Sequence, residues 1–500
     1  FFSSALAATE EGEKSLEVTW SETPAISTPT NVIYILTDDQ RFDEMGFMNP
    51  IIDTPNIDRL ASEGVHFENA FVTTALCSPS RATILTGQYM HNHGVVDNNS
   101  PRNPNSVLFS EYLQIAGYDT AFIGKWHMGE AASASRNLDD PQPGFNHWVS
   151  FAGQGTYFDP TFNINGKRKS FKGYNADLLT DQAISWLNQV SKPNKKKKPF
   201  FLQIGYKAVH YPFQPPPRHA ERYSDKKIDY PETMANTEEN YQTQSNWIRE
   251  RRYGIHGIDH MQTGALDKDP VPDFDELYHN FCETVHALDE NIGRVLNQLD
   301  KLKLTEDTLV IYLGDNGFAL GEHGFYDKRD AFEESIRIPM LARHPKLIKA
   351  GTIVEKMTLN VDIAPTILEY AGVALPANPK MDGDSFLSLL QGKKPRHKWR
   401  EHFVYEYHWE WNFPATPTTF AIRTDNEKYV FYHGVWDRNG FYDLNSDPHE
   451  RHNLIRVPAY QERIFELREQ LFNELDETGG LSIPIRRPKN EQFYDRKLRR

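Results

Sequence analysis

The chain has 500 residues, of which 39% are hydrophobic and 25% are charged, and its formal net charge is −14. This composition is typical of a large globular protein, and the acidic balance argues against nucleic acid or an anionic membrane surface as partner. No run of 18 apolar residues occurs, so no segment is expected to span a bilayer. The two cysteines, Cys77 and Cys282, are too few for a disulfide framework.

The first 30 residues show no hydrophobic periodicity. Phe1 to Ala8 are mostly small or apolar and look like the cleavage region of a secretory signal without its basic start. We therefore predict that residues 1–30 are a signal remnant and lead-in, and that the protein is exported, either to the periplasm or into the medium. An ordinary disordered end is the alternative interpretation.

Continuous apolar, β-branched runs follow, and they predict strands buried on both faces of a sheet. Amphipathic helices are predicted between them, the longest over residues 278–302. This alternation indicates an α/β sandwich in which a large, mostly parallel sheet is flanked by helices. The predicted strands are 31–37, 120–124, 199–205, 308–314 and 337–342.

The pattern changes near residue 395, where short aromatic strands and a final helix near 460–475 are predicted. We expect a catalytic domain over residues 31–394 and a smaller C-terminal α+β subdomain over 395–500. The polar stretch 214–272 is predicted to be a long insertion that walls a site.

Acidic pairs follow two of the predicted strands: Asp38-Asp39 after the first and Asp315-Asn316 after the fourth. In open α/β sheets, ligands bind beyond the carboxyl ends of the strands. Adjacent carboxylates are costly to bury there unless a cation compensates them. Hard oxygen donors suit Ca²⁺ or Mg²⁺, and Ca²⁺ is favoured because it tolerates irregular geometry. Each pair alone could instead cap a turn or helix.

Lys125 and His127 follow the second strand, and His210 follows the third. On an extended segment, residues two apart point to the same side, so Lys125 and His127 could hold an anionic group and transfer a proton. Taken alone, a Lys-x-His pattern is also consistent with an ordinary surface.

The stretch from Cys77 to Arg81 reads Cys-Ser-Pro-Ser-Arg. We predict Ser78 as a helix N-cap, with Pro79 in the first turn. Cys77 would then lie at a helix N-terminus with Arg81 one turn on, which predicts a lowered thiol pKa. The alternative is a structural buried cysteine, the role we predict for Cys282.

Cys77-Ser-Pro-Ser-Arg81, followed by Thr86-Gly87, resembles the signature of type I sulfatases, in which the cysteine is oxidised to Cα-formylglycine. The acidic pairs, the Lys125 and His210 segments, and Lys328 match that family in order and spacing. The resemblance implies an alkaline-phosphatase-like fold, a sulfuric ester hydrolase, and a separate maturation enzyme as partner.

The same resemblance implies a role for each matching residue. Cys77, as the formylglycine hydrate, is the nucleophile, and Ca²⁺ touches it while bound by Asp38, Asp39, Asp315 and Asn316. Arg81 steadies the hydrate, and Lys125 and Lys328 clamp the sulfate oxygens. His127 accepts the proton when the sulfated hemiacetal breaks down, and His210, alone or with Lys328, protonates the leaving oxygen.

Stretches 88–99, 250–257, 321–328 and 333–339 look like the glycan-acting branch of the family, most like N-acetylglucosamine-6-sulfatases. The expected substrate is therefore a sulfated saccharide, such as a glycosaminoglycan or marine polysaccharide fragment. Tryptophans could stack on a sugar ring, although in an antiparallel sheet they also form cores and interfaces. The candidates for substrate contact are Arg251, Arg252, His323, Trp409 and Trp411.

Two other functions stay open at this point. A phosphate mono- or diesterase of the same superfamily would generally have Thr or Ser as nucleophile and two zinc ions, so Cys77 and the hard-cation set argue against it. A glycan-binding pseudoenzyme would keep Cys77 as an unmodified thiol.

Overall fold

The computed structural model describes residues 16, 19–20, 30–103, 105–128, 139–192, 198–262, 273–395 and 397–484. Most of the predicted signal remnant and the last residues of the chain lie outside these ranges. Within them, no helix combines the length and the apolar character needed to cross a membrane.

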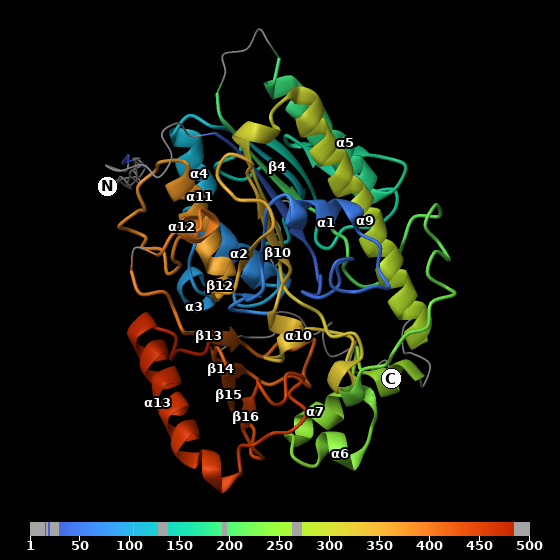
Figure 1. Cartoon of the computed structure of the whole chain (residues 1–500), viewed down its shortest axis with the longest axis vertical. Helices are drawn as coiled ribbons and strands as arrows, with labels where there is room; N and C mark the ends of the chain where they lie inside the picture. The colour runs from blue at the N-terminus through green and yellow to red at the C-terminus, as the bar shows by residue number, and fades with distance from the viewer. Residues whose placement is uncertain are drawn as a thin grey trace, which may run out of the picture.

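A ten-stranded sheet forms the centre of the molecule (Figure 1). Its central strands β9, β1, β8 and β4 are mutually parallel, so the predicted mostly parallel sheet is confirmed. Strand β10 runs antiparallel to β9. The order is β11 (Thr352–Val354), β2 (Val65–Phe67), β10 (Met340–Arg343), β9 (Thr308–Gly314), β1 (Asn31–Thr37), β8 (Phe200–Gly205), β4 (Asp119–Lys125), β5 (His147–Phe151), β6 (Thr161–Ile164) and β7 (Lys167–Ser170).

Helices cover both faces of this sheet because successive side chains of each buried strand point to opposite faces. In β1, Val32, Tyr34 and Leu36 pack into one core, and Ile33 and Ile35 pack into the other. The first core contains α2 (Cys77–Thr86), α4 (Phe109–Ile115), α11 (Ile363–Tyr370) and α12 (Leu387–Leu390). The second contains α1 (Pro55–Ser62), α5 (Asn175–Val190) and α9 (Phe274–Leu302).

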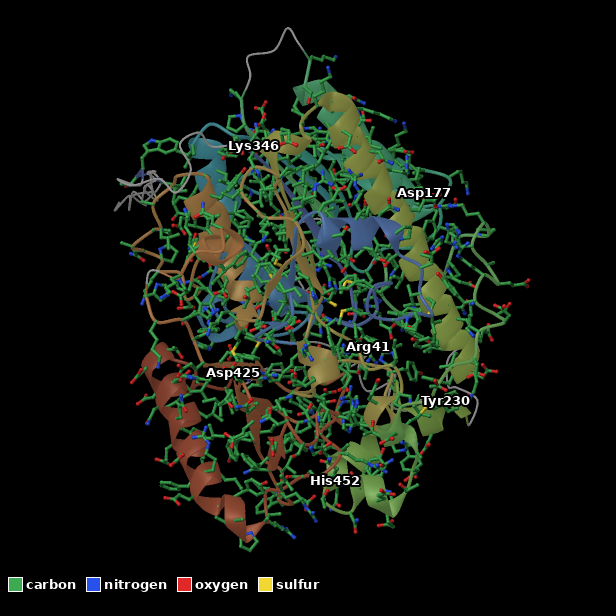
Figure 2. The ribbon with its side chains drawn as sticks, in the orientation of Figure 1. Arg41, Asp177, Tyr230, Lys346, Asp425 and His452 are labelled. Atoms are coloured by element: carbon green, nitrogen blue, oxygen red, sulfur yellow. The ribbon has the colours of Figure 1, made fainter. Side chains whose placement is uncertain are left out.

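The described part of the predicted insertion, residues 214–262, consists of loops and short helices. It lies beside the C-terminal sheet (Figure 1). Figure 2 places Tyr230 of the insertion and His452 of the C-terminal region in the same half of the molecule. Ion pairs from Arg451 to Glu232 and Glu239 join the two regions. The helices are α6 (Glu238–Tyr241), α7 (Asn246–Arg251) and α8 (Ile258–Gln262).

A second, four-stranded antiparallel sheet packs against the last long helix, α13 (Gln461–Thr478). The short strands and helix predicted beyond residue 395 are therefore present, while the boundary at 395 stays a prediction. The strands are β13 (His402–Tyr407), β14 (Thr419–Thr424), β15 (Glu427–Tyr432) and β16 (Gly440–Asp443). Shorter elements elsewhere are α3 (Met90–His93), α10 (Glu333–Ile336), β3 (Ala70–Phe71) and β12 (Thr358–Leu359).

The structure differs from the sequence patterns for one strand and for the location of two tryptophans. The strand predicted over 337–342 begins only at Met340, after Pro339, which has no amide hydrogen to donate to a neighbouring strand. Trp409 and Trp411 lie in the loop between β13 and β14, not in the antiparallel sheet itself.

An ion pair joins α3 to the second sheet and predicts a pH-dependent contribution to stability. His91 Nδ1 lies 3.0 Å from Glu406 Oε1 of β13. Burial alone would lower the pKa of His91, but the Glu406 carboxylate outweighs it and raises that pKa. A raised histidine pKa stabilises the folded state below the unfolded value of about 6.5, and the contribution disappears as pH rises through the folded value.

We therefore expect His91→Gln to cost about 1 kcal/mol of unfolding free energy at pH 6, a magnitude typical of such pairs, and less at pH 9. Urea unfolding of both proteins at the two pH values measures the difference. An equal cost at both values would contradict the role given to the charged pair.

Candidate functional site

The parallel strands bring the predicted polar segments to one edge of the sheet. Asp38 and Asp39 follow β1, and Asp315 and Asn316 follow the adjacent strand β9. Lys125 is the last residue of β4, and His210 lies beyond the end of β8. Gly124 allows the close approach of β4 and β8, because its φ is +134° and a Cβ there would lie 1.9 Å from the Gly205 oxygen.

The two acidic pairs are bonded to each other. The Asp39 amide donates to Asp315 Oδ1 at 3.1 Å, and Asn316 Nδ2 donates to Asp39 Oδ1 at 2.8 Å. Asp39 Oδ2 and Asn316 Oδ1 are buried without a hydrogen-bond partner among the described residues. Unsatisfied buried oxygens are costly, and carboxylate and amide oxygens together suit a hard divalent cation. The residues present therefore fit the predicted Ca²⁺.

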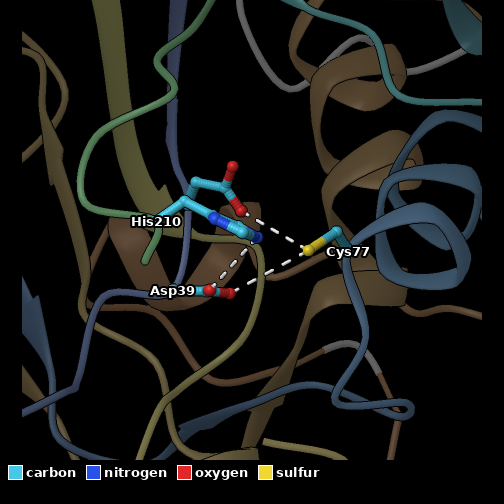
Figure 3. Close-up of side chains that lie close together, drawn as sticks. Asp39, Cys77 and His210 are labelled. Atoms are coloured by element: carbon cyan, nitrogen blue, oxygen red, sulfur yellow. Dashed lines mark hydrogen bonds and ion pairs between the residues drawn. The ribbon is translucent and has the colours of Figure 1, made fainter. Parts of the chain in front are cut away.

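Cys77 lies directly against these carboxylates (Figure 3). Its Sγ is 3.5 Å from Asp38 Oδ1, 3.9 Å from Asp39 Oδ1 and 3.3 Å from Lys328 Nζ. Asp38, Asp39, Cys77 and His210 each offer a possible ligand atom, and these four atoms lie within 4.8 Å of one another. Segments far apart in the sequence thus meet around the cysteine.

Two expectations about this segment are wrong. The thiol pKa of Cys77 is raised, because complete burial outweighs the lowering effect of Lys125 and Lys328. Helix α2 begins at Cys77 itself, with Leu76 as N-cap, so Ser78 is not the cap. The Ser78 hydroxyl instead donates to the backbone oxygen of His127.

Basic side chains compensate the carboxylates. Lys125 Nζ bonds to Asp38 and Gln154, Lys328 Nζ bonds to Asp39, and Arg81 Nε donates to Asp315 Oδ2 at 2.8 Å. Burial alone would raise the pKa of Asp38, but Lys125 lowers it well below its usual range. Burial and the neighbouring Asp38 raise the pKa of Asp315 to about 7. The site therefore holds a dense, nearly balanced set of charges.

Both predicted histidines lie in this charged region. His210 Nε2 is 3.6 Å from Asp39 Oδ2, and the Tyr157 hydroxyl donates to the His210 backbone oxygen at 2.6 Å. His127 is buried, with a positive φ of 53°. Burial, reinforced by nearby cations, lowers the pKa of both imidazoles well below the usual value. Both rings are therefore neutral at pH 7, and a neutral ring can accept a proton.

The structure adds residues that the sequence analysis missed. Lys207 is buried, its Nζ lies 4.7 Å from the centre of the Tyr157 ring, and burial followed by repulsion from Lys125 lowers its pKa to about 8. Gln154 bonds to Lys125. Lys207 lies three residues before His210, in the same segment that follows β8. This closeness to a predicted site residue is the one sequence signal that could have identified Lys207.

The predicted substrate contacts are divided between the interior and the surface. Arg251, Arg252 and His323 are at most 3% exposed, and the two arginines are engaged in internal ion pairs. The ring of His323 stacks on Phe332, with the centroids 3.6 Å apart. Trp409 is 49% exposed, and Trp411 is partly exposed. Contact of these five residues with a substrate stays a prediction.

Comparison with known proteins agrees with this arrangement. Residues 30–373 match the sulfatase family model, and residues 321–477 match the model of the N-sulphoglucosamine sulphohydrolase C-terminal region. The N-acetylglucosamine-6-O-sulfatase of Bacteroides thetaiotaomicron is 34% identical over 88% of this chain and 85% of its own length. An extracellular sulfatase Sulf-1 homolog of Caenorhabditis elegans is 33% identical over 76% of this chain and 53% of its own length.

A solved structure of a protein in complex with its substrate D-glucosamine-2-N,6-O-disulfate superimposes with a TM-score of 0.81 and 31% identity. The match covers 91% of this chain and 99% of the other. The family model spans more than half of the chain. The chain belongs to the sulfatase family.

Proposed function

We propose that the protein is a carbohydrate sulfatase that removes the 6-O-sulfate of a sulfated glucosamine residue. The observation that carries the proposal is the position of Cys77, whose Sγ lies within 3.9 Å of two carboxylates and a lysine at the rim of the sheet. The similarity to an N-acetylglucosamine-6-O-sulfatase and to a structure bound to a disulfated glucosamine supports this substrate class.

We propose that Cys77 is converted to formylglycine, whose hydrate supplies the oxygen nucleophile toward sulfur. The raised thiol pKa supports this part of the proposal, because a neutral buried thiol is a poor nucleophile by itself. Ca²⁺ bound by Asp38, Asp39, Asp315 and Asn316 would stabilise negative charge on the sulfate. Arg81 keeps Asp315 and the backbone of Lys125 in place by direct hydrogen bonds.

The lysines bind the sulfate group in this proposal. Lys125 and Lys328 pair with Asp38 and Asp39 in the structure. With a divalent cation bound by those carboxylates, the two ammonium groups would be available to bind sulfate oxygens. Cations fixed before the reaction stabilise the charge that develops on those oxygens without further rearrangement.

Proton transfer is assigned to the histidines. The backbone oxygen of His127 accepts from Ser78, next to Cys77, and we assign to the His127 side chain the proton released when the sulfated hemiacetal breaks down. Cleavage of the ester leaves an alkoxide on the sugar, which must gain a proton. We assign that proton to His210, alone or with Lys328, which both lie beside Asp39. Because the His210 ring is neutral in the structure, it would first take up a proton when the anionic sulfate group binds beside it. The exported location of the enzyme also stays a proposal, supported by a relative described as extracellular.

Hydrolysis of defined monosaccharides tests the proposal. We expect sulfate release from D-glucosamine-2-N,6-O-disulfate and N-acetylglucosamine-6-sulfate, with proton NMR showing loss of sulfate at carbon 6 only. A 3-O-sulfated glucosamine serves as the matched control and should react at least about 100 times more slowly, since unpaired polar groups in the pocket penalise the wrong isomer. Equal rates for both isomers, or hydrolysis of glucosamine-6-phosphate in place of the 6-sulfates, would refute the assignment.

A further inference from the structure

One buried arginine of the insertion holds the segment that carries Lys328. Arg251 is the last residue of α7 and is 2% exposed. Its Nη1 donates to Asp330 Oδ2 at 2.8 Å, and its Nη2 donates to Asp327 Oδ2 at 2.7 Å. Nη2 also donates to the backbone oxygen of Lys328 itself, at 2.6 Å. A single guanidinium therefore bonds to the residue before the lysine, to the residue two positions after it, and to the lysine's own main chain.

The backbone of this segment is held in a conformation that it would not adopt unaided. Arg329 has a φ of +88°, which is unfavourable for a residue other than glycine. Asp327 accepts from Arg251 and also from Arg329 Nη1, the latter at 2.6 Å. The Arg251 guanidinium further stacks on the Phe325 ring, 4.3 Å from its centre. These contacts fix the direction in which the Lys328 side chain leaves the main chain.

Lys328 needs such support because its side chain is long and contains several rotatable bonds. Its Nζ reaches Cys77 Sγ at 3.3 Å and bonds to Asp39, at the far end of four methylene groups. Holding such a chain in one conformation costs about 2 kcal/mol, and a shift of the backbone by 1 Å would move the ammonium group away from the reacting atoms.

From this geometry we propose that Arg251 is a positioning residue of the sulfatase reaction, which holds Lys328 in the orientation that reaches the Cys77 site. The proposal rests on the catalytic role given above to Lys328. It assigns Arg251 a role that differs from the substrate contact predicted from the sequence, and it gives the 214–272 insertion a part in catalysis. Lysine cannot replace Arg251 fully, because its single ammonium lacks the planar fork that reaches Asp327, Lys328 and Asp330 together.

A double-mutant cycle on the full-length protein tests the proposal, with D-glucosamine-2-N,6-O-disulfate as substrate. We expect Arg251→Gln to lower kcat at least about tenfold while KM changes less than about threefold, because an orientation is lost and the pocket is kept. Lys328→Ala should lower kcat further. The double variant should be no slower than Lys328→Ala alone, within about twofold, since Arg251 acts only through the lysine.

Arg400→Gln is the matched control. Arg400 is also largely buried and bonds to both carboxylate oxygens of Asp362, but within the described part of the chain none of its ion pairs or hydrogen bonds reaches residues 325–330. It should lower the melting temperature and leave kcat within about twofold. Arg251→Lys, which keeps the charge, enters the same cycle and should give an intermediate kcat, so the test does not depend on one variant that folds poorly.

The positioning role would be overturned if the loss of kcat in the double variant equalled the product of the two single losses. A wild-type kcat in both Arg251 variants would overturn it as well. A wild-type kcat in Lys328→Ala would instead overturn the role of Lys328 in the proposed function. The two failures are therefore distinguishable.

Discussion

Replacement of Cys77 by alanine is expected to lower kcat/KM for D-glucosamine-2-N,6-O-disulfate on the order of 10⁴-fold or more, as loss of a nucleophile does in other hydrolases. The Cys77 side chain lies between Asp38, Asp39 and Lys328, so the substitution removes the group that these charged side chains surround. The rest of the site would still bind substrate, and KM should change far less than kcat.

Cys282→Ala provides the matched control for this experiment. Cys282 is also fully buried, but it lies within α9 and belongs to the core on one face of the sheet. Its loss should reduce the free energy of unfolding by about 1 kcal/mol, the cost of a small cavity, and leave kcat unchanged. A Cys77→Ala protein with wild-type activity would refute the nucleophile assignment.

Intact-protein mass spectrometry separates catalysis from glycan binding alone. Conversion to formylglycine replaces the Cys77 sulfur and two hydrogens by one oxygen, so the converted protein is lighter than its sequence predicts. The same mass change should be present in Cys282→Ala and absent from Cys77→Ala. A full cysteine mass in active wild-type protein would contradict the proposed modification.

The convergence of the site could be predicted from the sequence because it follows from sheet geometry. Asp38-Asp39 and Asp315-Asn316 each follow an apolar run, and runs of that kind form parallel strands whose carboxyl ends meet. The polar segments after β4 and β8 follow by the same rule. No knowledge of loop conformation is needed for this step.

The electrostatics of the site could not be predicted in the same way. A helix N-terminus favours a thiolate, and that local rule predicted a lowered pKa for Cys77. The opposite direction results from the burial of Cys77 among distant segments, including Asp38 and Asp315. The contacts of Arg251 could not be predicted from the sequence either, because its hydrogen-bond partners Asp327 and Asp330 lie more than 70 residues away along the chain.

Removal of divalent cations is expected to have the second large effect. Dialysis against EGTA should lower kcat at least about 100-fold, and Ca²⁺ should restore it more fully than Mg²⁺. The physical reason is that the buried Asp39 Oδ2 and Asn316 Oδ1 lack hydrogen-bond partners among the described residues, and that Lys125 and Lys328 stay paired with Asp38 and Asp39 when no cation competes for them.

Calorimetry gives a second measurement that does not depend on activity. Because Ca²⁺ binds only the folded site, a concentration about 1,000 times Kd should raise the free energy of unfolding by about 4 kcal/mol. Asn316→Ala should weaken Ca²⁺ binding at least about tenfold. Asn163→Ala, which removes another buried asparagine in β6, should leave it unchanged. An EGTA-treated enzyme with unchanged kcat and melting temperature would show that the lysines alone balance the carboxylates, and the calcium assignment would then be wrong.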